Sequence, residues 1–278
     1  MKKRILFFTT CLLMFTSTQS VIHAENIRGN GNLVTKEVAV SDFDKITIGS
    51  GIGCNNRFFS QKSYKNPVFN YKQATTSASL SITIDENLYP YLEVNNWGDE
   101  LSVKTKGRVT INPSRFEING TSKSLREISV SGCINFVTVA PFSSDNLDIN
   151  VSGASDVLFN DATQIGEFNI RISGGGDLLA EKLICRKLES NVSGAGDITL
   201  TGKADKAKFT VSGAGDIKAF DFIVGDLECR VSGSGDARVN ATETLDVTIS
   251  GSGDVHYKGN AKVNTRVSGF GDIKKIND

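Results

Sequence analysis

Apolar and polar residues alternate along most of the chain, and a short glycine-rich segment interrupts the alternation again and again. The stretch NVSGAGDITL at 191–200 returns almost unchanged as TVSGAGDIKA at 210–219. Between these segments apolar residues occupy every second position, as in Ile198 and Leu200. A period of two is typical of β-strands, whereas an amphipathic helix would show a period of 3.6. The pattern predicts an all-β protein.

The glycine-rich motif repeats at a nearly constant interval. Its serines lie 18 to 21 residues apart, at Ser131, Ser152, Ser173, Ser193, Ser212, Ser232, Ser250 and Ser268. A period near 20 residues indicates a solenoid, in which each repeat buries its apolar face against its neighbours. One coil of about 20 residues, at roughly 3.3 Å each, is long enough for two or three short strands and their corners. We therefore predict a single-stranded parallel β-helix with coils of 18–21 residues.

Stacking in register places equivalent side chains in columns along the axis. We expect two inward columns, formed by Val192, Val211 and Val231 and by Ile198, Ile217 and Ala237. The glycines would give the corner unusual backbone angles, and the aspartate would accept hydrogen bonds from amides of its own corner. The residue between the glycines is small in interior repeats, so a large side chain there should strike the next coil. Phe270 holds this position in the last repeat and is expected to cap the stack.

The chain divides into a leader and one long domain. Residues 1–24 have a basic start, an apolar run too short to span a membrane, and Ala24 at an expected cleavage point, as in a secretory signal peptide. No later segment is apolar enough to cross a membrane as a helix. Residues 25–278 are predicted to form one β-helix domain, irregular over 25–125 and regular over 126–278. We expect export to the periplasm, the outer surface or the medium.

The irregular part contains the densest group of aromatic residues. Segments 77–85 and 100–111 alternate clearly and should be strands, 86–94 should contain a turn, and 54–76 is expected to be a long loop. If the protein has a binding surface, we expect it here, at Tyr71, Tyr89, Tyr91 and Trp97, because irregular segments carry function more often than a regular scaffold does. Packing of these rings into the core is the simpler alternative.

Three stretches together resemble a known family. These are VSDFDKITIGSGIG at 40–53, DENLYPYLEV with ELSVKTKG between 85 and 107, and the serial SGAGD copies. The combination resembles the "putative auto-transporter adhesin, head GIN domain" family, over about residues 38–260. The resemblance implies a right-handed, single-stranded β-helix and an adhesive role for an exported bacterial protein.

Composition narrows the candidate chemistry. The 31 basic and 31 acidic residues give a net charge of zero, so nothing favours nucleic acid or an anionic membrane as a partner. Cys54, Cys133, Cys185 and Cys229 are too widely and irregularly spaced for a zinc site. In an oxidising compartment a bridge between Cys54 and Cys133 is one alternative, while Cys229 should point inward as a small apolar residue. No cofactor is expected.

The motif aspartates are the sharpest candidates for a ligand site. Stacked carboxylates repel one another, and the repulsion could be offset by backbone amides or by a cation such as calcium, at Asp177, Asp197, Asp216, Asp236 and Asp254. The structural interpretation is favoured because each coil has only one glycine-rich corner. The motif serines lack a base, since His256 is the only histidine after residue 24. A ladder of hydroxyl groups is the better interpretation for them.

These observations lead to three classes of function. The first is an exported, non-enzymatic adhesin-like or cell-envelope interaction protein, which would bind a surface protein or a glycan. The second is a carbohydrate-active β-helix enzyme, with paired carboxylates as acid and base. The third is a structural envelope protein that associates with copies of itself. The first is preferred because no residue set singles out a catalytic centre.

Overall fold

The structure, a computed structural model, describes residues 25–49, 51–53 and 67–277. The predicted signal peptide, Cys54 and most of the predicted loop lie outside the described residues. Among the residues that are described, none forms a helix of the length and hydrophobicity needed to span a bilayer.

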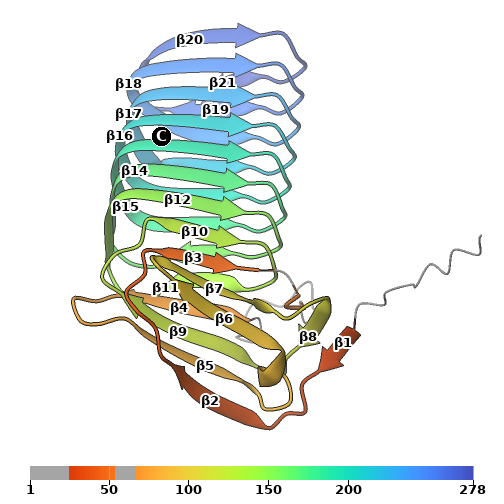
Figure 1. Ribbon diagram of the computed structural model, residues 1–278. Helices are drawn as coiled ribbons and strands as arrows, with labels where there is room; N and C mark the ends of the chain where they lie inside the picture. The colour runs from red at the N-terminus through yellow and green to blue at the C-terminus, as the bar shows by residue number, and fades with distance from the viewer. Residues whose placement is uncertain (1–24, 50, 54–66, 278) are drawn as a thin grey trace, which may run out of the picture.

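A parallel β-solenoid occupies the second half of the chain, as predicted (Figure 1). Each strand within the stack pairs in parallel with its equivalents one coil before and one coil after, and β20 and β21 pair only with the coil before. The solenoid strands are β10 (Glu127–Val130), β11 (Asn135–Thr138), β12 (Phe142–Val151), β13 (Val157–Phe159), β14 (Thr163–Ile172), β15 (Leu178–Val192), β16 (Ile198–Val211), β17 (Ile217–Val231), β18 (Ala237–Ile249), β19 (Val255–Lys258), β20 (Lys262–Val267) and β21 (Ile273–Lys275).

One coil has three straight segments. In the coil that ends at Val192, residues 178–180, 183–185 and 187–192 each pair with the equivalent segment of the next coil. Residues 173–177 form the glycine-rich corner and 181–182 form the second corner. A bend at Arg186 separates the last two segments, because the pairing skips this residue.

The predicted inward columns are confirmed. Val192 pairs with Val211 and Val211 with Val231, and all three are at most 1% exposed. Ile198, Ile217 and Ala237 form the second column and are fully buried. Because every coil contributes to both columns, the core is continuous from one end of the stack to the other.

The corner glycines are needed for close approach between coils. None of the motif glycines in the described residues has a positive φ. The expectation that they adopt unusual backbone angles is therefore wrong. Instead, a Cβ on Gly196 would lie 2.0 Å from the carbonyl oxygen of Gly176, and a Cβ on Gly176 would lie 1.9 Å from that of Ser155. A side chain at either position would force the coils apart.

The residue between the glycines faces solvent. Ala195 is exposed, and a Cβ on Gly175 would meet no atom within 4 Å. Phe270, at this position in the last repeat, is 95% exposed. The expectations that a large side chain here would strike the next coil and that Phe270 caps the stack are therefore both wrong.

The first part of the domain is a mixed cap on the solenoid. Its elements are β1 (Glu25–Arg28), β2 (Leu33–Val38), β3 (Lys45–Ile48), β4 (Val68–Gln73), β5 (Ser79–Asp85), the 3-10 turn η1 (Tyr89–Tyr91), β6 (Leu92–Trp97), β7 (Glu100–Thr105), β8 (Val109–Asn112) and β9 (Phe116–Ser122). Strand β5 pairs antiparallel with β2 and β9, and β6 pairs antiparallel with β7. Strands β3 and β4 continue in parallel into β10 and β11. The strands and the turn expected over 77–111 are present, whereas β4 lies inside the stretch expected to be a loop.

Candidate binding groove

An open groove of about 880 Å³ lies where the cap meets the first coils. Its lining has both polar and apolar surface and comes from successive coils: Asp44, Ser124, Leu125, Arg126, Ser143, Ser144, Asp145, Asn146, Gln164, Ile165, Gly166, Ile184, Cys185, Arg186, Lys203 and Asp205. We call it the junction groove. Serine hydroxyls, side-chain amides and charged groups all reach it, so it can both donate and accept hydrogen bonds.

The bend between two strand segments shapes the floor of the groove. Asp145, Gly166, Arg186 and Asp205 hold the bend in four successive coils, because each lies between paired residues on both sides. Gly166 has no side chain, and a Cβ there would lie 2.4 Å from the Asp145 carbonyl oxygen, so the two coils approach closely at this point. Arg186 Nη2 would lie 3.1 Å from the same Cβ. Gly166 therefore lies between an aspartate of the coil before it and an arginine of the coil after it.

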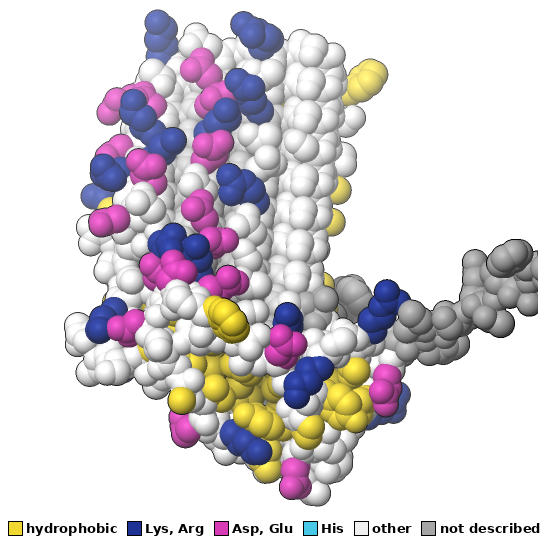
Figure 2. Space-filling view, viewed as in Figure 1, with side chains coloured by type: hydrophobic (Ala, Val, Ile, Leu, Met, Phe, Trp, Pro, Cys, Tyr) yellow, Lys and Arg dark blue, Asp and Glu magenta, His cyan; other side chains and the backbone are white. Residues whose placement is uncertain are grey.

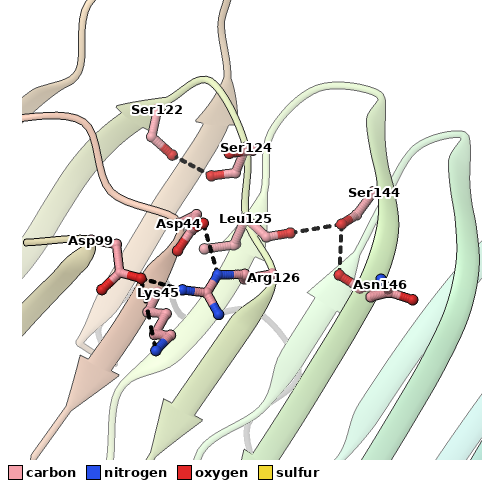
Figure 3. A network of polar contacts seen from close by, with 9 residues as sticks. All are labelled: Asp44, Lys45, Asp99, Ser122, Ser124, Leu125, Arg126, Ser144 and Asn146. Carbon is pink, nitrogen blue, oxygen red and sulfur yellow. Dashed lines mark hydrogen bonds and ion pairs between the residues drawn. The ribbon is translucent and has the colours of Figure 1, made fainter.

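Arg126 fixes the end of the groove next to the cap (Figure 3). Its Nε lies 2.7 Å from Asp44 Oδ2, and its Nη2 pairs with Asp99. Asp99 lies in the turn between β6 and β7, so Arg126 ties this hairpin to the start of β10. The Ser144 hydroxyl lies within hydrogen-bonding distance of the carbonyl oxygens of Leu125 and Asn146 and shares its one proton between them. These bonds position the first coils against the cap.

Four charged side chains of the groove have no partner within the described residues. Asp145, Arg186, Lys203 and Asp205 are exposed and form neither a hydrogen bond nor an ion pair with a described side chain. Counted with Asp44 and Arg126, the lining holds three acidic and three basic groups. The groove therefore has unsatisfied hydrogen-bonding capacity without a net charge.

Cys185 lies on the floor of the groove but is not a reactive thiol. It is 5% exposed, and burial together with the nearby Asp205 carboxylate raises its pKa to about 12. Cys229 is fully buried, as expected for an inward-facing residue, and burial raises its pKa to about 12 as well. Since the thiolate is the nucleophilic form, neither residue is suited to covalent catalysis at neutral pH.

The motif aspartates form a ladder from coil to coil. Oδ1 of Asp197 accepts a hydrogen bond from the backbone N–H of Asp216 at 2.8 Å, and Asp216 does the same for Asp236. The same bond links the other members of the column: Asp156, Asp177, Asp254 and Asp272. The predicted bond to amides of the same corner is wrong, because the next coil supplies the donor. No group of three or more metal-ligating side chains occurs in the part of the chain that the structure describes.

Two further contacts of the aspartate ladder are distinctive. At its start Asn135 Oδ1 accepts from the N–H of Asp156 at 3.0 Å, so a neutral amide serves as well as a carboxylate. Burial raises the pKa of Asp156. Further along, Lys218 Nζ lies 2.5 Å from Asp197 Oδ2, and this hydrogen bond raises the pKa of Lys218.

The motif serines are exposed, and only some of their hydroxyl groups form hydrogen bonds between coils. Ser232 Oγ lies 3.3 Å from Ser212 Oγ, and the Ser131 hydroxyl donates to the Ile48 carbonyl at 3.2 Å. His256 is on β19, and its neighbours on the adjacent strands are Arg238 and Lys274, not a serine. The structure places no base beside a motif serine in the coils described.

The four aromatic candidates do not form one surface. Tyr71 is fully buried, and its hydroxyl bonds to Ser122 Oγ at 2.9 Å, so its assignment to a binding surface is wrong. Tyr89 and Tyr91 are half-buried and pack against the core. Trp97 is 80% exposed at the end of β6, two residues before Asp99. Of the four, Trp97 alone is fully available to a ligand.

Figure 2 shows how side chains of each kind are distributed over one face. Acidic and basic groups are interspersed over the solenoid, while hydrophobic side chains gather on the cap. Cys133 is disulfide-bonded, in agreement with an oxidising compartment. The Cys54 side of the predicted bridge lies outside the described residues.

Sequence reasoning missed the junction groove. Its lining residues lie outside the conspicuous motif, and only stacking brings them together. One signal was available: in an alignment of the repeats, charged residues recur at the bend, at Asp145, Arg186 and Asp205. Charged residues that recur outside the glycine-rich motif indicate a second polar surface.

Known proteins that match the chain share its architecture. The family model described as "Putative auto-transporter adhesin, head GIN domain" matches residues 62–261. Similar crystal structures include a putative lipid binding protein from Parabacteroides distasonis ATCC 8503, with 30% identity and a TM-score of 0.83, and a putative adhesin from Parabacteroides merdae ATCC 43184, with 30% identity and a TM-score of 0.79. Each match covers 91% of this chain and 100% of the other. No curated protein matches the sequence.

Proposed function

The chain belongs to the auto-transporter adhesin, head GIN domain family, and from this premise we propose that it is an exported, non-enzymatic adhesin-like protein that binds a glycan in the junction groove. The leader pattern of residues 1–24 supports export. The family description supports attachment to a surface partner. The solenoid serves as a rigid support, and the groove lies at the end of the solenoid that contacts the cap.

The unpaired polar groups of the groove carry this proposal. Asp145 and Arg186 line the groove one coil before and one coil after Gly166, and Gln164 and Asn146 line it as well. A sugar presents several hydroxyl groups, each both donor and acceptor, and such groups suit carboxylate, guanidinium and amide partners at once. The balance of three acids and three bases favours a neutral ligand over a strongly charged one. One similar structure is described as a lipid binding protein, but charged and amide side chains here favour a hydroxylated ligand over an acyl chain.

Trp97 extends the proposed surface beyond the groove. The Asp99–Arg126 pair links its hairpin to the cap end of the groove. An exposed indole offers a flat apolar face on which a sugar ring can stack. A glycan longer than one residue would then contact both the polar groove and the aromatic ring.

A glycan array followed by titration of the best ligand tests the proposal. We expect the exported form of the protein to bind selected glycans without releasing new reducing ends. Asp145→Ala combined with Arg186→Ala should weaken binding at least tenfold, which corresponds to about 1.4 kcal/mol. Arg171→Ala is the matched control, because Arg171 is an exposed arginine of β14 outside the groove. Release of reducing ends by the wild type, or equal binding by both variants, would reject the proposal.

A further inference from the structure

The last coil presents an unpaired strand edge. Strand β20 pairs with β18 and β21 pairs with β19, and no described strand lies on their other side. The Ile249 carbonyl faces forward along the axis, since it accepts from the Ser268 N–H at 2.9 Å. Val267 is the partner of Ile249 in the next coil. By the same geometry the N–H and C=O groups of Val267, and those of Thr265 and Val263 by alternation, face away from the stack.

Apolar side chains at this end are only partly covered. Val267 is 49% exposed, whereas Ile249, its equivalent one coil earlier, is fully buried. Val263 and Ile273 are half-buried, while their partners Leu245 and Val255 are fully buried. The inward-facing residues of this coil are therefore covered on one side only, by the coil before it.

Hydrogen-bond acceptors of the corner are open at the same end. In each earlier coil the motif aspartate accepts the N–H of the next one, as Asp254 does from Asp272 at 2.8 Å. Likewise the Gly251 carbonyl accepts the N–H of Phe270 at 2.9 Å. Asp272 and Gly269 occupy the same positions one coil later, and no described residue donates to them. The Asp272 carboxylate and the Gly269 carbonyl oxygen are therefore available to accept hydrogen bonds from a strand added at this edge.

Basic side chains predominate on the two edge strands, and the corner between them contributes one acidic residue, Asp272. Strands β20 and β21 carry four basic residues and no acidic one: Lys262, Arg266, Lys274 and Lys275. Strand β18, one coil earlier, carries one basic and two acidic residues, namely Arg238, Glu243 and Asp246. A second copy of this end would place basic strands side by side, which costs free energy. An acidic strand would instead meet opposite charges.

From this combination we infer that the edge formed by β20 and β21 binds an extended, acidic segment of another protein by strand addition. The free backbone groups of Val263, Thr265 and Val267 would form the ladder. Apolar side chains of the added strand would cover Val267 and Ile273, and its acidic side chains would lie beside the basic ones. Affinity would come from the backbone ladder, and specificity from the charge.

Fluorescence anisotropy of the full exported chain with two labelled peptides tests this inference. One probe alternates valine with glutamate, and the other alternates valine with lysine. We expect the glutamate peptide to bind, with an affinity that falls as salt is raised, and the lysine peptide not to bind. Thr265→Pro should reduce binding by about tenfold, because proline removes an edge N–H that the stack does not use.

A charge reversal distinguishes specific strand addition from simple attraction. Lys262→Glu with Arg266→Glu should transfer the preference to the lysine peptide, whereas Lys206→Glu, in the middle of the stack, should change nothing. Far-UV circular dichroism and a thermal melt confirm that each variant is folded. Binding of the glutamate peptide that survives Thr265→Pro, or binding of neither peptide, would overturn the inference. These outcomes are independent of glycan binding, since the junction groove lies at the other end.

Discussion

Two neighbouring glycines in one corner allow a direct test of how the coils are stacked. Gly175 and Gly176 are adjacent in sequence but differ in their surroundings. A Cβ on Gly175 would meet nothing within 4 Å, while a Cβ on Gly176 would lie 1.9 Å from the Ser155 carbonyl oxygen. Gly175→Ala and Gly176→Ala add the same methyl group one residue apart. Each is the control for the other.

The expected cost of Gly176→Ala follows from the contacts of this corner. Relief of the overlap requires the two coils to separate locally by more than about 1 Å. This movement would lengthen the bonds from the N–H of Gly175 to the Gly153 carbonyl, now 3.0 Å, and from the N–H of Asp177 to Asp156 Oδ1, now 3.1 Å. Two lost hydrogen bonds at about 1 kcal/mol each, with residual overpacking, give a loss of about 2–4 kcal/mol. Gly175→Ala should instead stabilise by about 0.4–1 kcal/mol, because alanine restricts the unfolded chain.

Urea unfolding followed by far-UV circular dichroism measures the difference. With a slope of about 3 kcal/mol per molar urea, Gly176→Ala should lower the midpoint by about 1 M. Gly175→Ala should leave the midpoint unchanged or raise it slightly. Equal midpoints for the two variants would refute the explanation that these glycines are required by the approach of the coils.

Three further outcomes are expected. Burial raises the pKa of Asp156. Ionisation of this residue therefore lowers the free energy of unfolding as the pH rises through the folded-state pKa. Asp156→Asn should therefore raise the melting temperature at neutral pH but not below about pH 4, and an equal change at both would contradict this. The thiols of Cys185 and Cys229 should react with a thiol reagent only as fast as the protein unfolds, and rapid reaction in the native state would show that they are accessible. Tyr71→Phe should cost about 1 kcal/mol in urea unfolding by removing the bond to Ser122, and an unchanged midpoint would show that this bond contributes nothing.

The repeat made the solenoid predictable. Equal spacing and alternation define both the register and the inward face, so the columns of Val192 and Ile198 follow from the sequence. What each motif residue does was harder to predict. A glycine needed for close approach looks in sequence like one needed for positive φ. An aspartate bonded to the next coil likewise looks like one bonded to its own.

The cap and the groove depended on contacts that alternation does not encode. Strand β4 pairs with β9 and β11, and the Tyr71 ring stacks on Phe136, so Tyr71 is buried although the surrounding segment is polar. Asp145 and Arg186 lie two coils apart and reach the same groove only because the coils stack in register. Local sequence carries no information about such a pair until the register of the coils is known. Trp97 remained exposed because it ends its strand.

Hydrogen exchange of the full exported chain, with and without the best array glycan, tests the central claim most directly. If the junction groove is the binding site, the glycan should slow exchange in segments 124–126, 143–146 and 164–166, and leave the coils beyond 206 unchanged. Protection confined to the last coils, or spread evenly along the glycine-rich corners, would contradict the assignment of function to the groove.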